Sequence, residues 1–96
     1  MDRPRLQLTS ITIGTDDPHG LASVYRGLLG YRMTADDPAT GDDLGWAQLK
    51  PPAGELGPTL NFEGERQFRR PTWPAVAGGQ NATQHLDIWV DDLAEA

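Results

Sequence analysis

Several features that define common protein classes are missing from this sequence. It contains no cysteine, which excludes disulfide bonds, thiolate nucleophiles and cysteine-ligated metal sites. No apolar run approaches the ~18 residues of a membrane span, and the first ten residues, MDRPRLQLTS, lack the apolar core of a signal peptide. Glycine-rich phosphate loops and nucleophile elbows are also absent. We therefore expect a cytoplasmic protein without these chemistries.

Basic residues are in the minority. The chain has 8 Lys and Arg against 14 Asp and Glu, which gives a formal net charge of -6. Such a balance argues against nucleic acid and against a membrane surface as partners. The rest of the composition, 38% hydrophobic and 23% charged, is that of an ordinary globular domain with a modest core. We expect residues 1–96 to form a single domain.

An amphipathic helix is the clearest local prediction. Apolar side chains recur with helical spacing at Leu21, Val24, Tyr25, Leu28 and Leu29. Asp16 and Asp17 can cap the start of this helix, Pro18 suits its first position, and Gly30 suits the residue just beyond its end. His19, next to Pro18, is expected to face solvent.

Strands are predicted on both sides of this helix, from alternating apolar residues and from flanking Pro and Gly. The expected strands are 7–15, 31–35, 45–50, 59–63 and 84–90, and 91–93 resembles a helix start. The segment PPAGELGP predicts a hairpin-like connection between the third and fourth strands. Residues 65–83 lack a clean period, and we expect a long surface connection pinned by Phe68 and Trp73.

Two stretches of the chain resemble each other. SITIGTDD, residues 10–17, and HLDIWVDD, residues 85–92, align apolar residues at alternate positions and end in the same Asp pair. An internal repeat explains both the strand pattern and the helix cap. Chance is the alternative, because Asp pairs also occur at 36–37 and 42–43. A repeat would divide the chain into a first module at about 6–63, a link at 64–83 and an incomplete second module at 84–96.

The segments ITIGTDDPHGLASVYRGLLGYRM and HLDIWVDDLAEA resemble the vicinal oxygen chelate superfamily, and its glyoxalase-like branch in particular. This superfamily includes glyoxalases, extradiol dioxygenases and bleomycin-resistance proteins. The resemblance implies an α+β fold, in which βαβββ modules form a cupped mixed sheet with helices on its outer face. It also implies a pocket for a small molecule, at or near the interface of a homodimer.

Metal-dependent relatives take ligands from the first and last strands of each module, and this chain matches one of the three positions it contains. Ser10 stands where the resemblance implies His, and Asn61 stands where it implies Glu. His85 matches, and the fourth position lies beyond Ala96. One imidazole with a hydroxyl and an amide would hold a divalent ion weakly. We therefore predict no cofactor; a bound metal would use His85 with Glu63 or Asp87.

Alternation assigns one face of each strand to the helix and the other to something else. The second face combines two tryptophans with hydrogen-bonding groups, as a small-molecule pocket does. The simpler interpretation is a sheet with one face exposed to solvent. The predicted ligand-binding residues are Ser10, Thr12, Trp46, Gln48, Asn61, Asp87 and Trp89.

His85 is open to three interpretations: a structural histidine hydrogen-bonded to the backbone or to a neighbouring carboxylate, a ligand-contacting or general acid-base group, and a metal ligand. We expect the protein to bind a small organic molecule. Two alternatives are a metal-dependent lyase, isomerase or dioxygenase that uses His85, and a non-catalytic protein that sequesters a drug-like compound.

Overall fold

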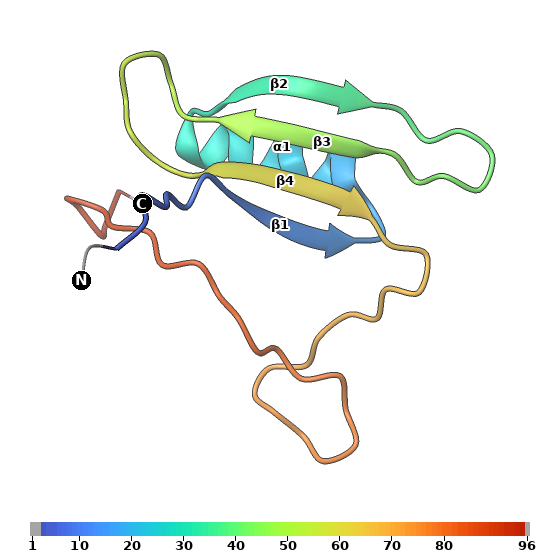
Figure 1. Cartoon of the computed structure of the whole chain (residues 1–96). Coiled ribbons are helices and arrows are strands. Elements are labelled where there is room, and N and C mark those ends of the chain that lie inside the picture. The colour runs from blue at the N-terminus through green and yellow to red at the C-terminus, as the bar shows by residue number, and fades with distance from the viewer. Residues whose placement is uncertain (1–2, 96) are drawn as a thin grey trace.

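Four strands and one helix make up the regular structure of the chain, in a computed structural model that describes residues 3–95. They follow one another as β1 (Ser10–Thr15), α1 (Pro18–Leu29), β2 (Arg32–Asp37), β3 (Trp46–Lys50) and β4 (Thr59–Gly64). Together they form an α+β fold in which α1 lies against one face of the sheet (Figure 1). No helix within residues 3–95 is both long and apolar enough to cross a bilayer.

The sheet is mixed, with the strand order β1-β4-β3-β2. β3 is antiparallel to both β2 and β4, so the hairpin-like connection predicted between β3 and β4 is confirmed. β1 pairs in parallel with β4, from Ser10 opposite Thr59 to Thr15 opposite Gly64. β1 and β2 are therefore the two edges of the sheet, and the first strand of the fold pairs with the last.

The predicted helix begins and ends where its capping residues indicate. The Asp17 carboxylate accepts a hydrogen bond of 3.0 Å from the Gly20 N–H, and Pro18 occupies the first turn. Gly30 adopts the left-handed conformation, with φ of 67°, and its N–H donates to the carbonyl oxygen of Arg26. Glycine takes this conformation without the clash that a Cβ atom would cause.

The core lies between α1 and the strands, and the faces predicted for β1, β3 and β4 are confirmed. Its buried residues are Ala22 of α1 and, from β3 and β4, Ala47, Leu49, Leu60 and Phe62, with Ile11 and Ile13 of β1 packed beside them. The Tyr25 ring stacks on Phe62 with 5.6 Å between the ring centroids. Full burial of a side chain such as Phe62 or Leu49 contributes about 2 kcal/mol each, so these strands provide most of the apolar stabilisation.

The apolar stripe of α1 is wider than the surface that the sheet covers. Leu21, Tyr25 and Leu29 pack against the core. Val24 and Leu28 lie on the far flank of the stripe and stay 63% and 60% exposed. The helical period therefore located the helix correctly but overstated how much of it is buried.

The strand predicted at 84–90 was wrong, and so was the helix start at 91–93. Residues 84–90 have no strand pairing, and beyond them a turn joins Asp92 and Glu95. Leu86, Ile88 and Val90, which were expected to pack on a helix, stay 37–42% exposed. An open hollow of about 770 Å³ separates this part of the chain from β1. Alternation shows which face of a segment could be buried, but a strand also needs a neighbour for its hydrogen bonds.

The connection at 65–83 runs out beyond the β1 edge, as Figure 1 shows. Phe68 is partly buried, whereas Trp73 is 80% exposed and does not pin the chain. Asn81 closes this loop instead. Its side-chain oxygen accepts from the Thr72 hydroxyl at 2.7 Å and from the Val76 N–H at 2.9 Å. Polar closure of the loop leaves its aromatic residue free to point into solvent.

Candidate functional site

The sheet face opposite α1 is the best candidate site. Because alternate residues of a strand point to opposite faces, burial of Ala47, Leu49, Leu60 and Phe62 against α1 turns their neighbours to the open face. These outward-facing neighbours are polar except for one tryptophan. They comprise Thr12 of β1, Trp46, Gln48 and Lys50 of β3, and Thr59, Asn61 and Glu63 of β4.

A row of hydrogen-bonded side chains crosses all four strands on this face. The Thr34 hydroxyl of β2 donates to the Gln48 side-chain oxygen at 2.9 Å. The Gln48 amide nitrogen donates to the Asn61 side-chain oxygen at 2.8 Å, and the Asn61 nitrogen donates to the Thr12 hydroxyl at 3.4 Å. We call these four residues the amide row. Because each amide has two N–H donors and an oxygen with two lone pairs, the row keeps capacity for further hydrogen bonds.

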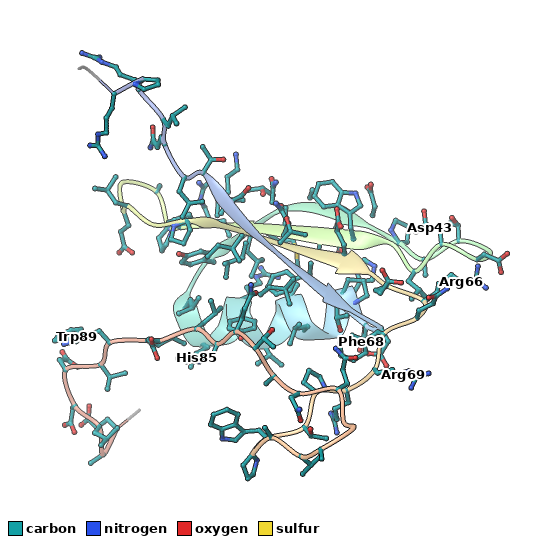
Figure 2. The ribbon with its side chains drawn as sticks, turned by 60° about the horizontal axis from the view of Figure 1, so that its bottom comes forward. Asp43, Arg66, Phe68, Arg69, His85 and Trp89 are labelled. Carbon is teal, nitrogen blue, oxygen red and sulfur yellow. The ribbon has the colours of Figure 1, made fainter. Side chains whose placement is uncertain are left out.

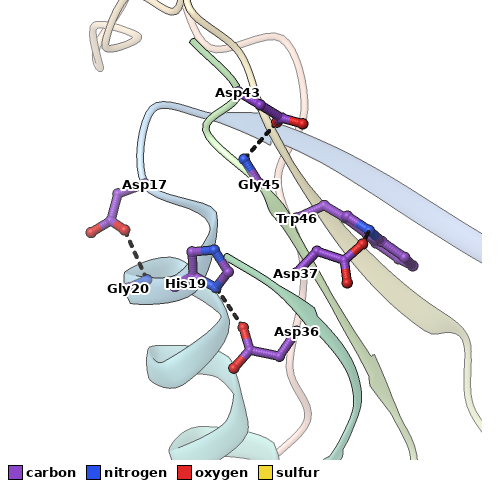
Figure 3. A network of polar contacts seen from close by, with 8 residues as sticks. All are labelled: Asp17, His19, Gly20, Asp36, Asp37, Asp43, Gly45 and Trp46. Carbon is purple, nitrogen blue, oxygen red and sulfur yellow. Dashed lines mark hydrogen bonds and ion pairs between the residues drawn. The ribbon is translucent and has the colours of Figure 1, made fainter. Parts of the chain in front are cut away.

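Trp46 borders the amide row on one side. Its indole N–H donates to the Asp37 carboxylate of β2 (Figure 3). Glu63 of β4 is paired with Trp46 in the sheet register. The indole is partly buried and held between an acidic residue on each neighbouring strand. Apolar ring surface therefore lies beside amide groups, a combination that binds small organic molecules.

Two basic residues border the amide row on its other side. Arg32 of β2 and Lys50 of β3 are direct register partners. The Arg32 Nε–H donates to the carbonyl oxygen of Pro51 at 3.0 Å. Lys50 is exposed, and neither residue forms an ion pair within residues 3–95. Positive and negative charge thus lie at opposite ends of the open face.

The structure brings together five of the residues predicted to bind a ligand. Thr12, Gln48 and Asn61 belong to the amide row, Trp46 borders it, and Ser10 lies near the start of β1 opposite Thr59. The other three predicted site residues belong to the C-terminal segment. His85 and Trp89 lie away from this face, beyond the β1 edge (Figure 2), and Asp87 lies beside His85. Trp89 is 84% exposed and does not lie beside Trp46. The two tryptophans therefore do not line a common site in this structure.

His85 lies in the segment that faces β1 across the open hollow. The hollow is lined by residues 11–14 of β1, by Tyr25 and Pro71, and by residues 80–86. The His85 Nε2 atom lies 3.5 Å from a carboxylate oxygen of Asp87, and both side chains are highly exposed. All three interpretations of His85 stay predictions.

Of the possible metal ligands, His85 and Asp87 lie close together in the C-terminal segment. Glu63 lies apart from them, on the open face of β4. Within residues 3–95, no group of three or more His, Asp and Glu side chains is placed to hold a metal ion.

The expectation that His19 faces solvent was wrong. Its Nδ1 atom lies 2.5 Å from a carboxylate oxygen of Asp36, and the side chain is only 33% exposed (Figure 3). The Nε2 atom is buried without a hydrogen-bond partner within the described chain, next to Gly45. The start of α1 packs against the end of β2 and the entry to β3, which a local sequence pattern does not reveal.

Sequence reasoning missed several residues of the open face, among them Thr34, Arg32 and Asp37. A register shift between Met33 and Ala35 brings Thr34 to Gln48. Plain alternation along β2 cannot predict such an irregularity. Lys50 alternates with the buried Leu49 and so falls on the open face, but its partner Arg32 could be found only from the pairing of β2 with β3.

Comparison with known proteins adds no relative to this picture: no family model, no curated protein and no solved structure matches the chain.

Proposed function

We propose that this protein binds a small organic molecule on the open face of its sheet, as a glyoxalase-like protein of the vicinal oxygen chelate type. The observation that carries the proposal is the amide row with Trp46 beside it. The element order strand, helix, strand, strand, strand is that of one βαβββ module and supports the proposed type. Curvature of the sheet into a cup belongs to the same proposal.

A binding role accounts for features that a merely solvated sheet face does not require. The two amide side chains bond to each other and to a threonine hydroxyl on either side, which holds them in defined orientations, so a ligand meets preorganised donors and acceptors. Trp46 offers a flat apolar surface, and its Asp37 contact restrains the ring. Stacking on the indole and hydrogen bonding to the amides would together fix the orientation of the ligand.

The test uses a variant of the protein in which Trp46 is the only tryptophan. In a Trp73→Phe/Trp89→Phe background, drug-like aromatic compounds are titrated while indole emission is recorded. We expect saturable quenching, because the ligand stacks on Trp46. A second substitution, Asn61→Leu, should weaken binding about tenfold, since it removes one amide of the row at a cost typical of a hydrogen bond to a ligand.

Trp89→Ala in the otherwise native chain is the matched control. It should keep the parent affinity, measured by titration calorimetry, because Trp89 lies away from the open face. A ligand that binds Trp46→Ala and Asn61→Leu as tightly as the parent would place the binding site elsewhere and defeat the proposal.

A further inference from the structure

The open face carries charges of opposite sign at the two ends of its strands. At one end, Arg32 and Lys50 are direct partners on neighbouring strands. Like charges placed opposite each other destabilise a sheet. Neither residue has a carboxylate partner within residues 3–95 to offset this repulsion. An anion bound between them would remove it.

The other end of the same face has the opposite character. In the register of the sheet, Trp46 has Asp37 on one side and Glu63 on the other. An indole attracts cations through the negative face of its ring, and two flanking carboxylates strengthen that attraction. A flat cation stacked on Trp46 would lie within reach of both acidic side chains.

The two charged ends are separated by the amide row. Trp46 and Lys50 lie four residues apart on β3, with Gln48 midway between them. At the rise of a strand, four residues span about 13 Å. This separation suits one small molecule with a positive charge at one end, a negative charge at the other and an amide between them.

We propose that the ligand of the open face is a zwitterionic aromatic amide. Its aromatic cation stacks on Trp46 between Asp37 and Glu63, and its amide bonds to Gln48 and Asn61. Its carboxylate lies between Arg32 and Lys50. The inference rests on the proposed function and adds the class of ligand and its direction along β3.

A second copy of the chain is the main rival occupant of this face. Two copies stacked face to face about a twofold axis would also join the basic end of one to the acidic end of the other. We favour the small molecule because the amide row lies midway between the charges. In a face-to-face dimer, the free donors and acceptors of the row would meet only another copy of the same amides.

Four probes test the inference on the full chain by titration calorimetry. They are 4-guanidinobenzoylglycine, which has both charges, benzoylglycine, which lacks the cation, 4-guanidinobenzamide, which lacks the carboxylate, and benzamide, which lacks both. We expect the zwitterion to bind about threefold more tightly than either singly charged probe, as exposed charge pairs allow. It should bind roughly tenfold more tightly than benzamide.

Two substitutions assign each charge to its end. Lys50→Met should lower the affinity for the zwitterion toward that for 4-guanidinobenzamide, with Arg32 left at the basic end, and should not change the affinity for 4-guanidinobenzamide. Glu63→Gln should lower the affinity for the zwitterion toward that for benzoylglycine, with Asp37 left at the acidic end, and should not change the affinity for benzoylglycine. Both residues are exposed and lie outside the core, so the variants should fold.

Three results would overturn the inference. If benzamide binds as tightly as the zwitterion, the two charged ends of the face do not contribute to binding. The inference about the ligand class then fails, whereas the proposed binding function stands. If none of the probes binds, the proposed function fails with the inference. If light scattering shows a dimer that Lys50→Glu dissociates and added Glu63→Lys restores, a second copy occupies the face.

Discussion

Gly45 has little room for a side chain. It lies just before β3 with φ of 81°, and a Cβ atom there would overlap the carbonyl oxygen of Asp37 and crowd the His19 ring. We expect Gly45→Ala to lower the free energy of unfolding by about 3 kcal/mol, since left-handed strain alone costs about 1–2 kcal/mol. Urea denaturation measures this loss.

Gly54→Ala is the matched control for that substitution. Gly54 has nearly the same φ, 83°, but within residues 3–95 no atom other than those of its chain neighbours lies within 4 Å of the added Cβ. Gly54→Ala should lower the free energy of unfolding by the backbone strain alone, about 1–2 kcal/mol. Equal losses at Gly45 and Gly54 would show that crowding against Asp37 and His19 is unimportant.

The start of α1 depends on one of two adjacent aspartates. Asp17 bonds to the Gly20 N–H, whereas Asp16 has no side-chain hydrogen bond within the part of the chain that the structure describes, residues 3–95. We expect Asp17→Ala to cost about 1 kcal/mol and Asp16→Ala less than about 0.5 kcal/mol. Thermal unfolding followed by circular dichroism compares the two variants, and a larger loss for Asp16→Ala would contradict the cap assignment.

The exposed flank of α1 should tolerate charge. Leu28 is 60% exposed, whereas Leu29 packs against the core. We expect Leu28→Lys to change the free energy of unfolding by less than about 0.5 kcal/mol. Leu29→Lys should cost at least about 2 kcal/mol, because it brings a charge into the apolar contact with the sheet. Similar losses in urea titrations of both variants would mean that another surface covers Leu28.

Elements whose determinants are local could be predicted from the sequence. The cap at Asp17, the helical period and Gly30 together locate α1. Alternation assigned the faces of β3 and β4, because both strands are half buried. The amide row could be predicted only as a set of residues, since its connections depend on the strand order and on the irregularity at Thr34. Residues 84–90 have a strand pattern without a neighbouring strand, and pattern alone cannot supply one.

For the whole molecule, the core cluster and all four strands lie between residues 10 and 64. Removing residues 84–96 should therefore change the free energy of unfolding by less than about 1 kcal/mol, because changes outside the core have small effects on stability. Urea denaturation of a chain ending at residue 83 measures it. A loss of several kcal/mol would mean that the C-terminal segment packs more closely against β1 than the open hollow between them indicates.

The pairing of β1 with β4 also sets the order in which the chain can acquire its structure. On the ribosome, α1 can coil within microseconds of its emergence. β1 must wait until Thr59–Gly64 has been made, which takes roughly 3–10 seconds at ordinary rates of synthesis. During that interval Ile11 and Ile13 have no sheet to cover them. The nascent chain is therefore most prone to aggregate just before β4 emerges.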